Sequence, residues 1–299
     1  MIELQQMLHG YKLGHNYVQG SIILPSNHDM DKIATLSDWS EFVDKSGERD
    51  YITAYPLLES PYYVIAKSWY ADEMRRPGCV WTHSLLIQRN EMEKITDYRQ
   101  LMTLFKRPVV DKEDFSDYSK TIVLNEKAVY QDSKGYPSLS VAKVSELYAA
   151  MLSPQPVSIL KEVDNTELQK LLLALYNYLP SGLLWQSSLC SGTSLPRSYE
   201  GQLLSLQFVT HDGGNVIYLS NKIPYQGSQL VAVSLLNEQR QLPMLIRHFE
   251  AELGDDVHRL QGFLEVVVLV NRVCKNEEEK RQVLLSIPVS YTHLRAHET

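Results

Sequence analysis

The sequence predicts an α+β protein with a strand-rich N-terminal domain followed by a mixed α/β middle domain. Over the first hundred residues, short segments rich in aromatic and β-branched residues alternate with turns. From residue 139 onward, stretches with helical spacing of apolar residues alternate with short apolar runs. Residues 106–120, a charged segment without periodicity, lie between these two regions and are predicted to be a linker. We therefore expect domains at residues 1–120 and 138–275.

The N-terminal elements follow from residue type and from the positions of proline and glycine. Residues 16–25 are β-rich and stop at a proline, and apolar spacing indicates a helix over residues 30–42. Two short β-type segments, residues 51–59 and 62–69, are separated by a Glu-Ser-Pro turn, which predicts a hairpin.

Residues 78–87 form a further strand candidate, and residues 92–105 have the apolar spacing of a helix. Alternation along the strand places Cys79, Trp81, His83 and Leu85 on one face.

The middle domain begins with a predicted helix and strand. The clearest helix covers residues 165–180, with Asn165 or Thr166 as its cap. A hairpin turn is expected at residues 212–214. The remaining predictions are a helix at 139–152, strands at 156–163, 182–192 and 201–221, and helices at 242–253 and 257–273.

Composition narrows the class of protein. The chain has 29 Lys and Arg against 36 Asp and Glu, a net charge of −7, so nucleic-acid binding gains no support. The three cysteines lie far apart, without a disulfide framework, and no signal peptide opens the chain. The strongest apolar run, residues 263–270, is far shorter than the roughly 20 residues of a membrane span. A cytoplasmic protein without membrane contact is expected.

The last eleven residues, 289–299, resemble a translated DNA-sequencing adapter. Such a segment is excluded from fold reasoning, and the histidines within it carry no functional weight. We expect the natural C-terminus to be missing, the alternative being a disordered natural tail.

The segment "HGYKLGH", residues 9–15, combines two histidines with two glycines. A metal site needs three or four ligands, and only His83 and Asp38 are available to complete one, without any supporting spacing. A turn whose histidines bond backbone groups is the simpler interpretation, so neither a metal nor another cofactor is expected.

A cysteine hydrolase is the other alternative at this end. Cys79 and His83 fall four residues apart on one strand, roughly 13 Å by strand rise, so they form no direct dyad. His9 or His15 would have to approach the thiol instead. The small, hydroxyl-rich residues 188–194 suit an anion-binding turn but lack the ending of a nucleotide loop.

Five segments, in order and spacing, resemble the N-terminal domain, type 1, of GTPase-associated protein 1. They are "HGYKLGH", "LSDWS", "YITAYPL", "YYVIAKSW" and "RPGCVWTHSLLI". Residues 183–209 are similar to that family's middle domain. The resemblance implies an adaptor or recognition component of a GTPase-centred bacterial conflict system that acts against invaders. Its partners would be the GTPase and other proteins of that system, and it transfers no catalytic residues.

The first hypothesis is therefore a non-enzymatic adaptor, whose candidate binding residues are His9, Tyr11, His15, Asp38, Tyr55 and His83. The alternative is a hydrolytic enzyme, whose catalytic candidates are His9, His15, Cys79 and His83. A third idea, regulation of nucleotide turnover by an arginine finger, needs an exposed Arg197 or Arg75.

Overall fold

The computed structural model describes residues 1–11, 14–38, 50–74, 78–109, 114–125, 130, 135–211 and 225–286. The predicted turn at 212–214, the candidate Arg75 and the adapter-like residues 289–299 lie outside the described residues.

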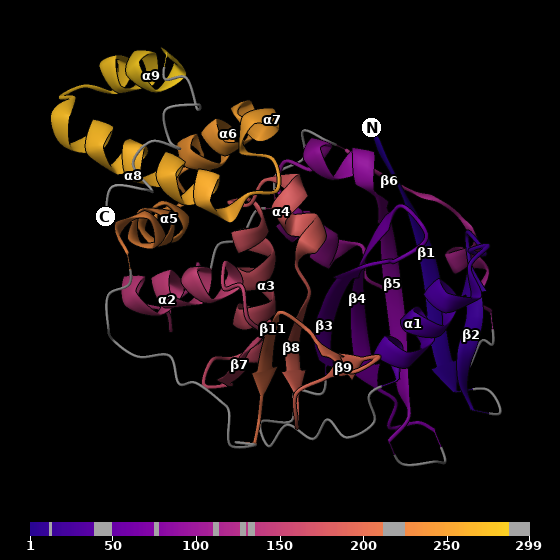
Figure 1. Cartoon of the computed structure of the whole chain (residues 1–299). Coiled ribbons are helices and arrows are strands. Elements are labelled where there is room, and N and C mark those ends of the chain that lie inside the picture. Colours follow the sequence, from indigo (N-terminus) through magenta and orange to yellow (C-terminus); the bar gives the residue numbers. More distant parts are fainter. Residues whose placement is uncertain are drawn as a thin grey trace.

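A mixed sheet of nine strands organises the described part of the chain (Figure 1). The strands are β1 (Ile2–Tyr11), β2 (His15–Gly20), β3 (Asp50–Pro56), β4 (Tyr62–Tyr70), β5 (Val80–Gln88), β6 (Ile122–Leu124), β7 (Val157–Leu160), β8 (Leu189–Thr193) and β11 (Leu206–Val209). Their order is β2-β1-β5-β4-β3-β8-β11-β7, with β6 paired to β1. Pairing is antiparallel from β2 to β8 and parallel between β8, β11 and β7. Strands β9 (Ser198–Tyr199) and β10 (Gln202–Leu203) form a separate hairpin.

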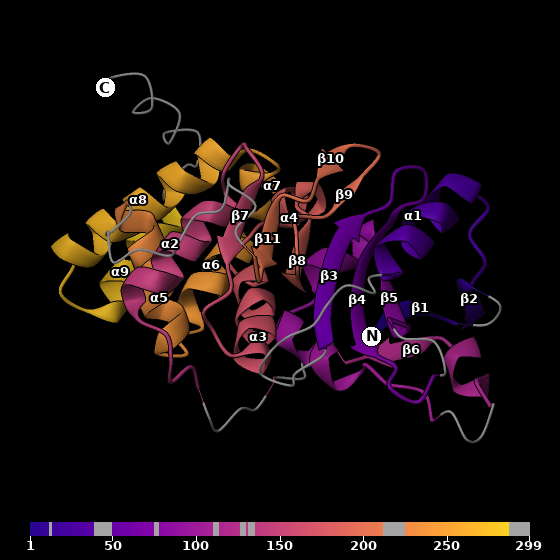
Figure 2. The same cartoon turned by 90° about the horizontal axis from the view of Figure 1, so that it is seen from below.

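Helices cover both faces of the sheet and build a second layer beside it (Figures 1 and 2). The α-helices of the described residues are α1 (Asn27–Ser37), α2 (Val141–Met151), α3 (Asn165–Tyr176), α4 (Ser181–Gln186), α5 (Gln226–Leu236), α6 (Gln241–His248), α7 (Glu250–Leu253), α8 (Val257–Val273) and α9 (Glu277–Ser286). Short 3₁₀ helices are η1 (Arg89–Lys94), η2 (Tyr98–Thr103) and η4 (Ser116–Ser119). The fold class is α+β, as predicted. None of the described helices has the length and apolar character needed to cross a membrane.

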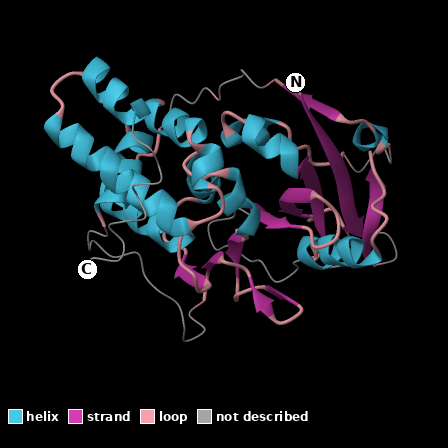
Figure 3. Cartoon of the chain, turned by 45° about the horizontal axis from the view of Figure 1, so that its top comes forward, coloured by secondary structure: helices cyan, strands magenta, loops and turns pink. Residues whose placement is uncertain are grey.

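Two apolar cores lie on the two sides of the sheet. Helix α1 packs Ile33 and Leu36 against Met7 of β1 and against β3 and β4. On the other side, α3 is buried around nearly its whole circumference, because it lies between the sheet and the helical layer (Figure 3). Its second half, residues 171–176, is apolar all round, which suits such an interior position. The helix predicted at 165–180 is confirmed as far as Tyr176, but its predicted cap, Asn165 or Thr166, is wrong. The cap is Asp164, whose carboxylate accepts the Glu167 N–H at 3.0 Å.

The hairpin predicted across residues 59–61 is confirmed, since β3 and β4 pair antiparallel with Tyr55 opposite Val64. Its turn is fixed by Asp29 of α1, a buried carboxylate. Asp29 accepts the backbone N–H groups of Leu58, Glu59 and Ser60 at 2.9, 3.2 and 2.7 Å. Helix α1 and the hairpin are therefore locked together.

The single helix predicted over residues 92–105 is wrong. The backbone of Ile95 is extended, so the segment breaks into η1 and η2. Asp97 caps η2, and Asn177 at the end of α3 accepts the Tyr98 N–H at 3.0 Å. Tertiary hydrogen bonds outweigh the helical pattern here.

The strand predicted over residues 182–192 is correct only in its second half. Its first half is α4, which follows Pro180, and β8 begins at Leu189. Helices α5 and α9 and strands β1 and β6 were not among the predicted elements.

Residues 106–120, which read as a linker, pack on the sheet wherever they are described. Tyr118 of η4 donates to the Lys106 carbonyl at 3.0 Å, and β6 follows as a partner of β1. Thr53 of β3 pairs with Cys190 of β8. A strand of the predicted N-terminal domain and a strand of the predicted middle domain therefore belong to the same sheet. The division into domains at 1–120 and 138–275 stays a prediction.

Candidate functional site

The candidate residues divide between the two faces of the sheet. In the register of β1 with β5, Leu8 lies opposite His83 and His9 lies opposite Thr82. Side chains alternate along a strand, so His9 faces α1 and His83 faces the other side. Cys79 lies on the His83 side, in an apolar cluster with Leu8 and Trp81. The structure therefore brings His9 and His15 together and keeps Cys79 and His83 apart from them.

A set of polar side chains, buried or half-buried except for Asp38 at its edge, lies between α1 and the sheet, and we call it the α1-face polar cluster. Its members are His9, His15, Ser37, Asp38, Ser68, Thr82 and Arg197.

The two histidines of the N-terminal segment stack on each other. Their ring centroids are 6.2 Å apart with an interplanar angle of 19°, and Tyr17 meets the His9 ring edge-on at 5.9 Å. His9 is fully buried, and neither of its ring nitrogens has a hydrogen-bond partner among the described residues. Burial, and secondarily the nearby His15, lowers the pKa of His9 to about 3. His9 is therefore neutral at physiological pH.

The tautomer of His15 follows from its hydrogen bonds. Ser37 donates its hydroxyl proton to the Ala34 carbonyl at 2.8 Å, so its oxygen accepts from His15 Nε2–H, also at 2.8 Å. His15 Nδ1 then faces the Asp38 carboxylate at 3.8 Å. Burial lowers the pKa of His15, Asp38 raises it, and the positive charge of Arg197 lowers it further.

The hydroxyl groups beside the two histidine rings form hydrogen bonds within the protein. Thr82 donates to the Ser37 carbonyl at 2.8 Å, and Ser68 therefore donates to the Thr82 hydroxyl at 2.7 Å. On the same face, the Cys190 thiol donates to the Gly192 carbonyl at 3.7 Å. The Thr82 hydrogen bond joins the C-terminal end of α1 to β5, and the Ser68 hydrogen bond joins β5 to β4. Both bonds therefore stabilise the fold.

Arg197 is buried at 2% exposure between α1 and β3. Its guanidinium donates to the Thr53 hydroxyl at 3.4 Å and to the Thr35 carbonyl at 3.3 Å, and it lies 5.8 Å from the Tyr51 ring centroid. An arginine finger must reach a nucleotide bound by another protein. Arg197 is not exposed, so the condition set for it as a finger is not met.

His83 has a separate environment on the opposite face. Its Nδ1 accepts the Lys106 N–H at 3.1 Å, so its Nε2 carries the proton and donates to Gln6 Oε1 at 2.8 Å. The Gln6 amide nitrogen donates in turn to the Asp117 and Lys120 carbonyls at 3.0 and 2.5 Å. Burial, with a smaller effect of the Lys106 charge, lowers the pKa of His83 to about 3. Here His83 anchors residues 106–120 to the sheet.

Each glycine of "HGYKLGH" is required at its position for a different physical reason. Gly10 lies in β1 under the ring of Trp81, where an added Cβ would lie 2.1 Å from Trp81 Cζ3. Gly14 has φ of +122°, a conformation that favours glycine. Lys12 and Leu13 between them lie outside the described residues. Strands β1 and β2 pair on either side, with Tyr11 opposite His15, as a turn requires.

The remaining binding candidates lie in unlike settings. Tyr55 is buried under α1 with the Lys32 ammonium 5.7 Å from its ring centroid, whereas Tyr11 is half-buried at the end of β1. Asp38 is exposed at the end of α1. Across the residues that the structure describes, no three His, Cys, Asp or Glu side chains are grouped to hold a metal ion.

Sequence reasoning missed Gln6, although the signal was present. Ile2, Leu4, Gln6 and Leu8 alternate along one face of β1, which places an amide in an apolar surface. A buried amide needs partners, so the pattern itself points to a hydrogen-bonded core glutamine.

Comparison with known proteins bears on the N-terminal part of the chain. Residues 3–105 match the family described as GTPase-associated protein 1, N-terminal domain type 1. No curated protein and no solved structure matches the chain. The likeness of residues 183–209 to the middle domain stays a prediction. The match ends at residue 105, just beyond η2, and so covers the strands β1 to β5 that hold His9, His15 and His83. Residues 3–105, about a third of the chain, are therefore similar to the N-terminal domain, type 1, of GTPase-associated protein 1.

Proposed function

We propose that this protein is a non-enzymatic adaptor that binds a GTPase in a cytoplasmic bacterial defence system. The observation that carries the proposal is the match of residues 3–105 to a domain named for its association with a GTPase. The environments of the histidines agree with it, because Ser37 and Thr82 donate to backbone carbonyls and His83 accepts a backbone N–H, so these bonds hold the fold together.

A surface beside α1 has the composition of a protein-binding site, and we call it the α1 surface. Its members are Ile23, His28, Asp31, Leu58, Glu59, Tyr199, Glu200 and Leu203. Figure 1 shows the β9 segment of this surface beside α1.

The α1 surface is held in place by its own polar contacts. His28 Nε2 lies 2.9 Å from Glu200 and its Nδ1 lies 3.7 Å from Glu59. The Tyr199 ring lies 5.7 Å from the His28 ring, and Ser26 donates to Glu59 at 2.5 Å. A preorganised surface loses less conformational entropy when it binds.

The α1 surface combines exposed aliphatic side chains with negative charge. Leu58 and Leu203 are 56% and 47% exposed, and Ile23 is more exposed still. Asp31, Glu59 and Glu200 add exposed carboxylates to the same surface. Apolar anchors and a tyrosine inside a charged rim are typical of protein interfaces. We infer that the partner presents a basic rim around an apolar centre, because complementary charge favours association.

Co-purification tests the proposal directly. The gene is tagged in its native bacterial operon, and proteins that co-purify with the tagged product are identified by mass spectrometry. The GTPase encoded beside it is expected among them, and deletion of the gene is expected to increase phage plaque formation. Failure to associate with any product of the operon would contradict the adaptor role.

Substitutions on the α1 surface test whether this surface is the one that binds the GTPase. Leu58→Asp and Leu203→Asp are expected to abolish co-purification of the GTPase. Leu269→Asp on α8 is the matched control, because Leu269 is 44% exposed and lies in the helical layer. Co-purification unaffected by the two α1-surface variants would leave the GTPase as partner but place its contact elsewhere on the chain.

A further inference from the structure

A hollow of about 330 Å³ lies between η2, the end of α3 and the connection from α5 to α6. This volume falls within the range of small-molecule sites in proteins. Its walls include the apolar side chains Leu235, Pro243 and Met244 and the ring of Tyr178. Of the lining residues, Thr96, Asp97 and Arg99 fall within the matched residues 3–105, and none belongs to the α1 surface.

Three arginines line this hollow: Arg99, Arg240 and Arg247. Arg99 is already paired, because its guanidinium donates to both oxygens of Asp97 at 2.8 to 3.2 Å. In the part of the chain that the structure describes, the guanidinium groups of Arg240 and Arg247 have no hydrogen bond and no ion pair. Arg247 is half-buried, where a guanidinium without acceptors is costly.

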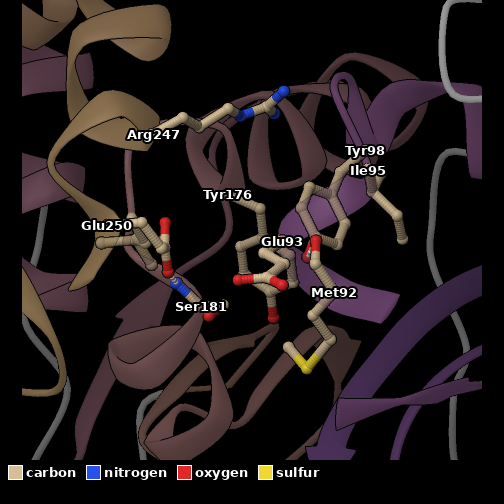
Figure 4. A pocket seen from close by; sticks show the side chains of 9 residues that line it. Met92, Glu93, Ile95, Tyr98, Tyr176, Ser181, Arg247 and Glu250 are labelled. Atoms are coloured by element: carbon tan, nitrogen blue, oxygen red, sulfur yellow. Dashed lines mark hydrogen bonds between the residues drawn. The ribbon is translucent and has the colours of Figure 1, made fainter. Parts of the chain in front are cut away.

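Asp97 and Glu250 act on Arg247 through their negative charge, but each carboxylate has a hydrogen-bonded partner of its own. Asp97 is occupied by Arg99 and also accepts from the Asn177 amide at 3.2 Å. Glu250 accepts the Ser181 backbone N–H, and Figure 4 shows its carboxylate at Ser181 while Arg247 extends toward Tyr98. Glu238 is exposed at the rim. With Asp97 and Arg99 cancelling, the hollow itself presents two guanidinium groups against one exposed carboxylate.

We propose that this hollow is a binding site for a small phosphorylated molecule, whose phosphate lies between Arg240 and Arg247. A phosphate monoester carries close to two negative charges, which matches two guanidinium groups better than a carboxylate does. The apolar wall with Tyr178 would contact the organic part of the molecule. The assignment does not rest on the proposed GTPase partner, and the two fail separately.

Isothermal titration calorimetry tests the site on the whole chain, with inorganic phosphate and ribose 5-phosphate as probes and ribose and acetate as comparison ligands. We expect ribose 5-phosphate and inorganic phosphate to bind once per chain, and ribose and acetate to bind at least about tenfold more weakly. Absence of binding by both phosphates at about 10 mM would overturn the proposal. Binding of acetate as tight as that of phosphate, or of inorganic phosphate without ribose 5-phosphate, would contradict the assignment to a phosphorylated molecule.

Variants locate the site. Arg240→Gln and Arg247→Gln are each expected to weaken ribose 5-phosphate by about tenfold or more, since each removes charge-assisted hydrogen bonds. Arg240 is exposed, so its substitution leaves the core intact even if Arg247→Gln disturbs packing. Arg259→Gln is the matched control, because Arg259 lies on α8 outside the hollow. Wild-type affinity in Arg240→Gln, or an equal loss in Arg259→Gln, would refute the location.

Discussion

His9 and His83 lie on adjacent antiparallel strands and point to opposite faces of one sheet. The two rings therefore belong to separate packed regions, one under α1 and one under η4. Each is buried and each has its pKa lowered to about 3. This separation shapes the following predictions.

Stability is expected to fall as the pH drops below 6.5. In the unfolded chain His9 and His83 bind protons near pH 6.5, whereas in the folded chain they stay neutral down to about pH 3. The unfolded state then binds more protons, so each histidine lowers the free energy of unfolding by about 1.4 kcal/mol per pH unit in that window. Urea unfolding at about pH 6 and about pH 5, where carboxylates titrate little, measures the slope.

A substitution of His83 tests how much of this pH dependence comes from that residue. His83→Gln is expected to reduce the slope by about 1.4 kcal/mol per pH unit, whatever its effect on stability at pH 7. His258→Gln, at an exposed position on α8, serves as the control and should keep the wild-type slope. Equal slopes in wild type and His83→Gln would show that His83 titrates alike in the folded and unfolded chain.

Gln6→Leu is expected to destabilise the protein by about 3 kcal/mol or more. The change leaves His83 Nε2–H and the carbonyls of Asp117 and Lys120 without their buried partner. Gln5→Leu is the control one residue away, on the other face and partly exposed, where we expect about 1 kcal/mol or less. Chemical denaturation measures both, and similar losses in the two variants would contradict the assigned role of Gln6.

Gly10→Ala is expected to cost about 2 kcal/mol or more, because the new Cβ would overlap the Trp81 ring. Trp81 is held by its indole N–H, which donates to Glu73 at 2.9 Å, so the ring cannot move without losing that bond. In a double-mutant cycle, Gly10→Ala should destabilise the Trp81→Leu variant much less than it destabilises the wild type. Strict additivity of the two changes would count against the steric argument.

Asp38→Asn is expected to lower the pKa of His15 further, because the carboxylate raises it in the wild type. The measurement is the NMR titration of the His15 ring protons. Asp31→Asn, on an exposed position of the same helix, is the control and should leave that titration unchanged. A rise in the pKa of His15 in Asp38→Asn would contradict the assigned contact.

Local pattern predicted much of the fold, and long-range pairing did not follow from it. Alternation gave the strand at residues 78–87, and the Glu-Ser-Pro turn gave the β3–β4 hairpin. The antiparallel pairing of Thr53 with Cys190 joins segments more than a hundred residues apart, and no local signal encodes it. The break at Ile95 likewise depends on Asn177, which is distant in sequence.

The site was predictable only in part for the same reason. Periodicity placed His83 and Cys79 on one face, yet it did not reveal that β1 sends His9 to the other. Arg247 and Arg240 carried no sequence motif, because their convergence depends on how α6 packs beside η2.

The affinity of the purified chain for the GTPase proposed as its partner is the most direct measurement of the central claim. Titration of the two proteins is expected to give a dissociation constant of about 1 μM or tighter, weakened by about tenfold or more in Leu58→Asp and unchanged in Leu269→Asp. Absence of any complex at about 100 μM of both proteins would contradict the adaptor account.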